Sequence, residues 1–180
     1  MLTADQIINA CKAPDAAVHA NWPLIVAALQ EFGVDSDLVE AAAAGTIAIE
    51  TWRTFEPIQE RGGVDYFTRL YEHRTDLGNV NPGDGARFHG RGFVQITGRV
   101  NYRTFGHALG VDLEGNPELA LDPGVSARVL ALFFKTHHVA DHANAQDWPG
   151  ARLRVNGGTN GLTEFEADVN ALLGVLNGTV

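Results

Sequence analysis

The spacing of apolar residues along the chain predicts a mainly α-helical protein. Apolar positions recur at helical spacing over residues 36–50 and 124–138, and another helical run covers residues 162–176. Shorter helices are predicted where a capping residue, a proline or a glycine marks one end. Their ranges are 3–12, 21–33, 64–72 and 99–109.

Two segments rich in turn-forming residues interrupt these helices. Residues 75–92 and 156–161 are dense in Gly and Asn, so neither segment forms a regular helix. Residues 93–97 follow the first segment as a short extended piece, which predicts a small irregular β element near residues 88–97. No repeat, linker or low-complexity segment is visible. We therefore predict a single domain over residues 1–180, standing alone or as one module of a longer protein.

Composition and charge exclude several classes of function. The chain has 180 residues, of which 45% are hydrophobic, and this suits a globular domain with a substantial core. Its net charge of −9 argues against a nucleic-acid partner, because phosphate binding requires clustered Lys and Arg. No apolar run reaches the roughly 18 residues needed to cross a bilayer, so no membrane association is expected.

The cysteine count and the first residues of the chain bear on where it is made. Cys11 is the only cysteine, which excludes an internal disulfide and suits folding in a reducing cytoplasm. The segment that starts at Met1 lacks the basic and apolar regions of a secretory signal. We expect synthesis in the cytoplasm without a signal peptide.

Glu50 is the first candidate for chemistry. It ends a helix of apolar and small residues, and Thr51 and Trp52 follow it. A carboxylate at the edge of a hydrophobic wall has its charged form disfavoured, so it can donate a proton near neutral pH. That is the role of a general acid in glycoside hydrolysis, although a solvated glutamate at a helix end fits the same pattern.

A glycosidase needs a second carboxylate to activate water or to attack the sugar. Glu60 and Glu72 both lie downstream of Glu50, and Glu56 is a weaker third candidate. Arginines lie close after Glu60 and Glu72, so each also fits a structural ion pair. Their spacing along the chain does not choose between them.

The glycine-rich stretch over residues 83–102 adds groups suited to binding sugars. Its glycines allow close approach of the backbone to a ligand. Gln95, Thr97 and Asn101 offer neutral hydrogen-bonding groups, and Tyr71 and Tyr102 offer aromatic faces. A turn-rich loop with buried polar contacts is the alternative.

The segment Gly90-Arg-Gly-Phe-Val-Gln-Ile-Thr-Gly-Arg-Val-Asn-Tyr closely resembles the central signature of glycoside hydrolase family 19 chitinases and of related phage endolysins. Further matching segments follow in the family's order near residues 109–120 and 154–162, and residues 71–85 resemble the bacterial and phage branch. The resemblance runs from about residue 36 to residue 165. It implies a mainly α, lysozyme-like fold.

The resemblance also implies catalytic roles. Glu50 matches the general acid, although Ile49 replaces the usual His before it. Glu72 resembles the catalytic base of the chitinases and is our preferred second carboxylate, while Glu60 matches the second carboxylate of some phage relatives. Thr97 stands where chitinases carry a Ser that positions the attacking water, which implies an inverting mechanism.

Further positions match substrate contacts in the family. They are Gln95, Asn101, Tyr102 and Asn156, and Tyr71 is added for its aromatic face. The family uses no cofactor and no metal. His138 and His142 have the spacing of a helical metal pair, but the Glu of a His-Glu-x-x-His pattern is absent.

From these observations we expect an enzyme that cleaves β-1,4 linkages in bacterial peptidoglycan, as a muramidase-type endolysin. It would act as a monomer on glycan strands of the cell wall, after release from the host cytoplasm, alone or within a longer lysin. The alternatives are a chitinase acting on N-acetylglucosamine polymers and a non-catalytic glycan-binding module on the same scaffold.

Overall fold

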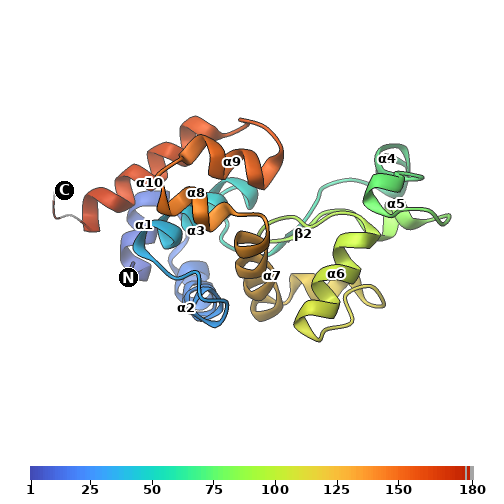
Figure 1. Ribbon diagram of the computed structural model, residues 1–180, viewed down its shortest axis with the longest axis horizontal. Helices are drawn as coiled ribbons and strands as arrows, with labels where there is room; N and C mark the ends of the chain where they lie inside the picture. Colours follow the sequence, from blue (N-terminus) through green and yellow to red (C-terminus); the bar gives the residue numbers. More distant parts are fainter. Residues whose placement is uncertain (177, 179–180) are drawn as a thin grey trace. The chain divides into compact units, whose positions relative to one another are not determined.

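The computed structural model describes residues 1–176 and 178. The chain divides into two compact units, which are Met1–Glu56 with Leu130–Val180 (unit 1) and Pro57–Val129 (unit 2). Helices predominate in both, which confirms the predicted fold class (Figure 1). The composition of the sequence does not change at residue 57 or residue 130, so the division into two units was not visible in it.

Unit 1 is built around one buried helix. Its helices include α1 (Ala4–Cys11), α2 (Asp15–Glu31), α3 (Asp37–Glu50), α8 (Val139–Asn144), α9 (Trp148–Asn156) and α10 (Leu162–Leu176). α3 contacts α1, α8, α9 and α10 (Figure 1). Gly45 permits the close approach of α10, because a Cβ at this position would lie 3.0 Å from the Phe165 ring. All residues of α3 between Val39 and Ala48 are buried, so Glu50 ends a helix that runs through the core.

Unit 2 combines short helices with a small sheet. Its elements include β1 (Ile58–Gln59), α4 (Val64–Tyr71), η1 (Thr75–Leu77), α5 (Asp84–Arg87), β2 (Arg91–Gly92), α6 (Arg99–Leu109) and η2 (Pro117–Leu121). α7 (Pro123–Thr136) begins in unit 2 and ends in unit 1. β1 and β2 are antiparallel, with Ile58 opposite Gly92 and Gln59 opposite Arg91. This pairing is the predicted small β element.

Capping residues place the ends of several helices as the sequence predicts. Thr3 and Gln6 form a reciprocal capping box at the start of α1. The Ser36 hydroxyl accepts a hydrogen bond from the backbone N–H of Val39 and begins α3. Gly110 ends α6 in a left-handed conformation. In each case the signal is local, so it can be recognised without knowledge of the packing.

The prediction for the second helix was wrong at its start. α2 begins at Asp15, directly after Pro14, and therefore includes Pro23 in its interior. A proline at this position removes one backbone hydrogen bond. Trp22 and Ile25, on either side of it, are buried. Their burial in the core favours the helix and offsets the lost bond.

Residues 93–97 are a second departure from the prediction. They form a turn rather than an extended segment, and the strand lies just before them at Arg91–Gly92. Gln95 has a left-handed backbone (φ 51°), and Arg91 pairs with Ile96 across the turn. The Gln95 side chain stabilises this conformation through hydrogen bonds to two backbone carbonyls. Short apolar runs do not reveal such side-chain bonds.

α8 and α9 follow α7 in a region where the pattern predicts no separate helix. The predicted helix over 124–138 ends at Thr136, and His138 adopts a left-handed backbone. His138 then pairs with Asp141, and His142 pairs with Asp147. The two imidazoles thus contact different carboxylates. No set of three or more metal-binding side chains gathers anywhere in the described part of the chain.

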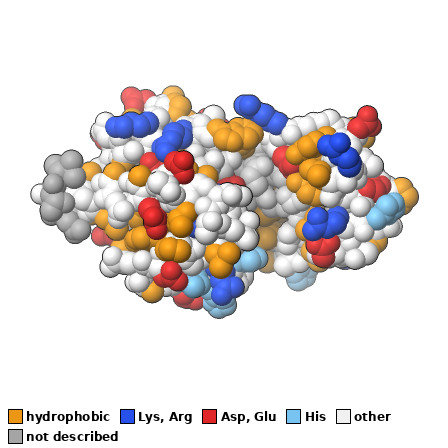
Figure 2. All heavy atoms as spheres, turned by 90° about the horizontal axis from the view of Figure 1, so that it is seen from above, with side chains coloured by type: hydrophobic (Ala, Val, Ile, Leu, Met, Phe, Trp, Pro, Cys, Tyr) orange, Lys and Arg blue, Asp and Glu red, His pale blue; other side chains and the backbone are white. Residues whose placement is uncertain are grey.

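The surface carries charged side chains of both signs. On the face seen in Figure 2, Lys and Arg side chains lie among Asp and Glu side chains and do not form one continuous basic area. Within residues 1–176 and 178, no helix has the length and apolar character to cross a membrane.

Candidate active site

In unit 2, the Glu60 side chain is fixed by the backbone and by one tyrosine. Glu60 follows β1, and its backbone N–H donates to the Gly90 carbonyl at 2.8 Å. The Gly90 N–H donates back to Glu60 Oε2 at 3.1 Å. The Tyr71 hydroxyl, at the end of α4, donates to Glu60 Oε1 at 2.9 Å. Burial, followed by this contact with Glu60, raises the pKa of Tyr71, so its hydroxyl keeps the proton that it donates.

Three side-chain oxygens converge beside Gly90. A Cβ added to this glycine would lie 2.9 Å from Gln95 Oε1, 3.2 Å from Glu60 Oε2 and 3.3 Å from Thr97 Oγ1. Any larger residue would therefore displace these groups. Gln95 is held in place because its Nε2 donates to the carbonyls of Ile58, at 2.8 Å, and Gly92, at 2.7 Å. The arrangement sets a carboxylate, an amide oxygen and a hydroxyl around one small space.

In unit 1, Glu50 is the last residue of α3 and is paired with a buried arginine. Arg152 Nη1 lies 2.6 Å from Glu50 Oε1, and the two side chains are 3% and 17% exposed. Arg152 Nε donates to the Asn160 carbonyl at 2.8 Å, and the Asn156 amide donates to the same carbonyl at 3.0 Å. The Gly-rich loop after α9 is thereby joined to the end of α3.

Comparisons with known proteins show which family the chain resembles. Residues 66–148 match the model of the family described as chitinase class I, glycoside hydrolase family 19. This match includes the Gly90–Tyr102 signature and the oxygens supplied by Gln95 and Thr97.

Over residues 66–148, somewhat less than half of its length, the chain resembles glycoside hydrolase family 19.

Proteins similar to this chain come from bacteria and plants. A glycosyl hydrolase family 19 domain-containing protein of Haemophilus influenzae is 33% identical over 96 residues, which cover 53% of this chain and 46% of that protein. Chitinase 8 of rice (Oryza sativa subsp. japonica) is 36% identical over 74 residues, covering 41% of this chain and 27% of the relative. The chain thus spans less than half the length of these two relatives.

Solved structures show that the fold is that of family 19 chitinases. Chitinase C from Streptomyces griseus superposes with a TM-score of 0.68 at 20% identity, covering 99% of this chain and 77% of that one. A bacterial family 19 chitinase gives a TM-score of 0.70 at 18% identity, covering 94% of each chain. The likeness establishes the lysozyme-like fold.

Glu72, the preferred second carboxylate from the sequence, has different contacts from Glu60 in the structure. Its carboxylate accepts hydrogen bonds from the backbone N–H groups of Gly83, at 2.6 Å, and Gly85, at 2.8 Å. These bonds hold the pKa of Glu72 below its ordinary value. Glu72 therefore closes the turn before α5, whereas Glu60 lies with Gln95 and Thr97.

Of the substrate contacts expected for α6, one is wrong. Tyr102 is fully buried, and its hydroxyl donates to the His89 carbonyl at 2.7 Å. Burial raises the pKa of Tyr102 to about 12. Its ring belongs to the core of unit 2 and has no surface to offer a sugar. Asn101 is half-buried, and its amide donates to the Thr97 carbonyl at 2.7 Å, which supports the residue that carries the hydroxyl.

Two residues in unit 1 that the sequence analysis did not assign lie near Glu50. One is Arg152, which falls in a segment without a clear apolar pattern. The other is Trp52, which is 55% exposed and lines an open pocket of about 410 Å³ with Ile49 and Glu164. Its left-handed backbone (φ 50°) follows the end of α3. A large aromatic residue two positions after a candidate acid was the signal that could have indicated it.

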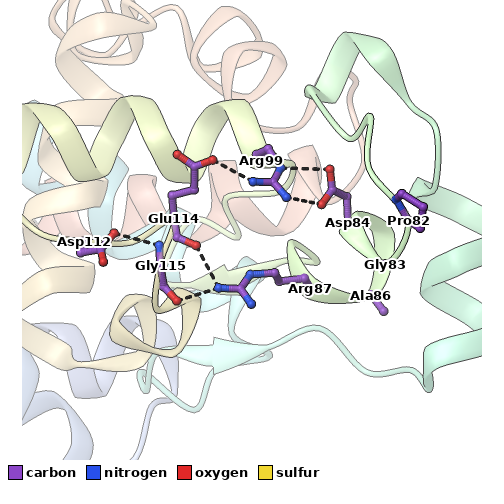
Figure 3. Close-up of a pocket in the computed structure, with 9 residues that line it drawn as sticks. All are labelled: Pro82, Gly83, Asp84, Ala86, Arg87, Arg99, Asp112, Glu114 and Gly115. Atoms are coloured by element: carbon purple, nitrogen blue, oxygen red, sulfur yellow. Dashed lines mark hydrogen bonds and ion pairs between the residues drawn. The ribbon is translucent and has the colours of Figure 1, made fainter.

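A pocket in unit 2 has a structural rather than a catalytic character (Figure 3). It is an open pocket of about 840 Å³, and its charged groups bond to one another. Arg99 pairs with the buried Asp84 and with Glu114, and Arg87 donates to the carbonyls of Glu114 and Gly115. Neither candidate carboxylate lines it. This network ties α5, α6 and the loop after α6 together.

The network predicts acid sensitivity. Arg103 and Arg99 lower the pKa of Glu114 from 4.5 to about 2. Because the pKa of Glu114 is lower in the folded protein than in the unfolded chain, the ionised carboxylate stabilises the fold fully above pH 4.5. This stabilisation is lost as the pH falls toward 2. We expect the melting temperature of the wild type to fall more steeply across this window than that of Glu114→Gln. Calorimetry at a series of pH values measures both slopes, and equal slopes would contradict the prediction.

Proposed function

We propose that this protein is a glycoside hydrolase that cleaves β-1,4 linkages in amino-sugar polymers by general acid–base catalysis. The observation that carries the proposal is the convergence of Glu60, Gln95 and Thr97 beside Gly90. Gly90, Gln95 and Thr97 belong to the segment that matches family 19, and Glu60 lies just before it. A carboxylate and a hydroxyl that lie close together can hold a water molecule, and the carboxylate can accept a proton from it. The Gln95 amide is suited to an acetamido group or a hydroxyl of the sugar.

The two proposed catalytic residues have separate tasks. Glu50 donates a proton to the departing glycosidic oxygen. Glu60 accepts a proton from water that Thr97 orients, and this water attacks the anomeric carbon as the C–O bond breaks. Direct attack by water is a single displacement, so the configuration at the anomeric carbon is inverted. No covalent sugar–enzyme intermediate is formed.

Bacterial peptidoglycan is the substrate that we propose first. Cys11 is buried and is the only cysteine, so the fold depends on packing and suits an enzyme made in a reducing cytoplasm. A phage lysin of this kind would act as a monomer on the wall after release from the host cell. Chitin is the second candidate, and the similarity to rice chitinase 8 favours it.

The test is to incubate the protein with purified bacterial cell walls and, separately, with N-acetylglucosamine hexamers. Release of new reducing ends from the walls, identified by mass spectrometry, supports peptidoglycan. Cleavage of the hexamers alone identifies a chitinase. NMR of the first products should show the α-anomer, because inversion of a β linkage produces it. No cleavage of either polymer would contradict the proposed function.

Replacing Tyr71 by Phe tests whether Glu60 acts as a base. The Tyr71 hydroxyl donates to both oxygens of this carboxylate, at 2.9 and 3.1 Å, and so stabilises its ionised form. Without that bond the Glu60 carboxylate is held less firmly toward the attacking water, so kcat should fall while KM changes little. The rate at the optimum should fall by about tenfold or less, as one hydrogen bond to a charged group is lost.

A matched control for that variant is Tyr66→Phe. Tyr66 lies on the same helix, α4, and is 39% exposed. Its kcat and KM should match those of the wild type. If Tyr71→Phe alters only KM, the tyrosine contacts the sugar, as the sequence predicts, and does not act through Glu60.

A further inference from the structure

The His89 side chain is buried in unit 2, directly before the glycine whose N–H binds Glu60. It is 5% exposed, and its Nδ1 lies 2.7 Å from the Ala86 carbonyl in α5. A carbonyl can only accept a hydrogen bond, so Nδ1 carries the proton of the ring. Burial lowers the pKa of His89, and the imidazole is therefore neutral near neutral pH. The catalytic scheme proposed above gives this ring no role.

The imidazole lies flat against the ring of Phe67. The two ring centroids are 4.1 Å apart, and the ring planes differ by 3°. Phe67 is in turn nearly parallel to Tyr71, with centroids 6.4 Å apart and planes that differ by 15°. The Tyr71 hydroxyl donates to both oxygens of Glu60, at 2.9 and 3.1 Å. The three rings thus connect a buried histidine to the candidate base.

The main chain at His89 reaches the same carboxylate by a second route. The His89 carbonyl accepts from the Tyr102 hydroxyl at 2.7 Å and from Arg91 Nη1 at 3.2 Å. The next backbone N–H, that of Gly90, donates to Glu60 Oε2 at 3.1 Å. These bonds involve only the backbone of His89. A substitution at this position therefore tests the imidazole and leaves the groups of this second route in place.

We propose that the His89 imidazole is a positioning residue for Glu60, acting through the two rings stacked beside it. In a close-packed interior, a flat ring at position 89 limits how Phe67 can move, and Phe67 limits the tilt of Tyr71. The direction of the Tyr71 hydroxyl then determines how the Glu60 carboxylate faces the attacking water. Since Glu60 is the base of the proposed function, the inference rests on that proposal.

The flat face of His89 matters more to this role than its second nitrogen. Nε2 is buried and has no hydrogen-bond partner among the described residues. Phenylalanine keeps a flat ring and loses only the Nδ1–H donor to Ala86. Leucine loses that donor and the flat ring together. The two substitutions therefore separate ring stacking from the bond to α5.

The test compares kcat, KM and melting temperature in His89→Phe and His89→Leu, on whichever polymer the wild type cleaves. Both variants should have a lower melting temperature, because the Ala86 carbonyl loses its donor. His89→Leu should lower kcat by about fivefold with little change in KM, since one hydrogen bond to a charged group is misdirected. His89→Phe should rescue most of that loss. His107→Leu is the matched control, because His107 is exposed on α6, and its kcat should match that of the wild type.

A double variant tests whether His89 acts through Tyr71. Tyr71→Phe keeps the ring and removes the hydroxyl, so the stack has no hydrogen bond left to direct. In that background His89→Leu should lower kcat by less than about twofold, because substitutions within one network are not additive. Losses of kcat that multiply would show that the two residues act independently, and would overturn the inference.

The outcomes separate this inference from the proposed function. If His89→Leu lowers only the melting temperature, the side chain is structural and the inference is wrong. An equal loss of kcat in His89→Phe and His89→Leu contradicts it as well, because a flat ring would then not suffice. If His89→Leu does not fold, Phe67→Leu removes the middle ring and replaces it in the double-variant comparison. Full activity in Glu60→Gln contradicts the base assignment itself, whatever the histidine variants do.

Discussion

Glu60→Gln is expected to reduce kcat by about 10²–10⁴-fold, the usual contribution of a positioned acid or base. Glutamine has nearly the same shape as glutamate and can still accept hydrogen bonds from Tyr71 and from the Gly90 N–H. It cannot accept a proton from the attacking water. The expected result is therefore a protein that folds and binds its polymer but does not cleave it, as measured by reducing ends and by binding of the intact polymer.

The matched control is Glu72→Gln. Glu72 accepts from the backbone of Gly83 and Gly85, and glutamine can replace part of that contact. We expect more than half of the wild-type kcat to remain. The opposite result would be full activity in Glu60→Gln and loss of activity in Glu72→Gln. It would identify Glu72 as the base, and the groups beside Gly90 would then only bind substrate.

Glu50→Gln is expected to have an effect of similar size, about 10²–10⁴-fold in kcat. The substitution removes the proton that would be transferred to the leaving oxygen. Circular dichroism should show a folded protein, because the glutamine oxygen can still accept from Arg152. The loss should be smaller for substrates with a good leaving group, such as nitrophenyl glycosides, because they depend less on an acid.

Glu56→Gln is the control for that variant. Glu56 is exposed and accepts from the Asn21 amide at 3.2 Å. Its activity should lie within about twofold of the wild type, as expected for surface substitutions away from special features. Full activity in Glu50→Gln would show that another group donates the proton.

The candidate site could be predicted from the sequence only in part. Glu60, Gln95 and Thr97 were all candidates from their residue types and from the family resemblance. The choice between Glu60 and Glu72 could not be made, because it depends on which backbone N–H groups each carboxylate meets. For Glu60 that N–H belongs to Gly90, some thirty positions away in the sequence, and it is brought close by the pairing of β1 and β2.

Tyr102 and Arg152 show two further limits. A tyrosine beside candidate ligands looks the same in sequence whether its ring faces a sugar or the core, and here the core encloses it. Arg152 lies in α9, which the apolar pattern did not predict. Its partner Glu50 belongs to a helix about a hundred residues earlier. Contacts of that range depend on tertiary packing rather than on local propensity.

Helices with capping residues were the most predictable part of the fold. Thr3 and Ser36 begin α1 and α3 because each side chain bonds to a backbone N–H three residues ahead. The start of α2 was mispredicted because Pro23 resembles a helix beginning, and only the burial of its neighbours shows that the helix continues through it. Tertiary packing overrides local preference there.

The reciprocal bonds between Glu60 and Gly90 have a consequence for how this protein can change over time. Both bonds involve the main chain of Gly90, and they do not depend on the side chains of the two short strands. Exchanges at Ile58 or Gln59 can therefore accumulate without detaching the carboxylate, provided that the ladder persists. Residues in these two strands can therefore be substituted to alter glycan preference, whereas Gly90 itself cannot be replaced by a larger residue.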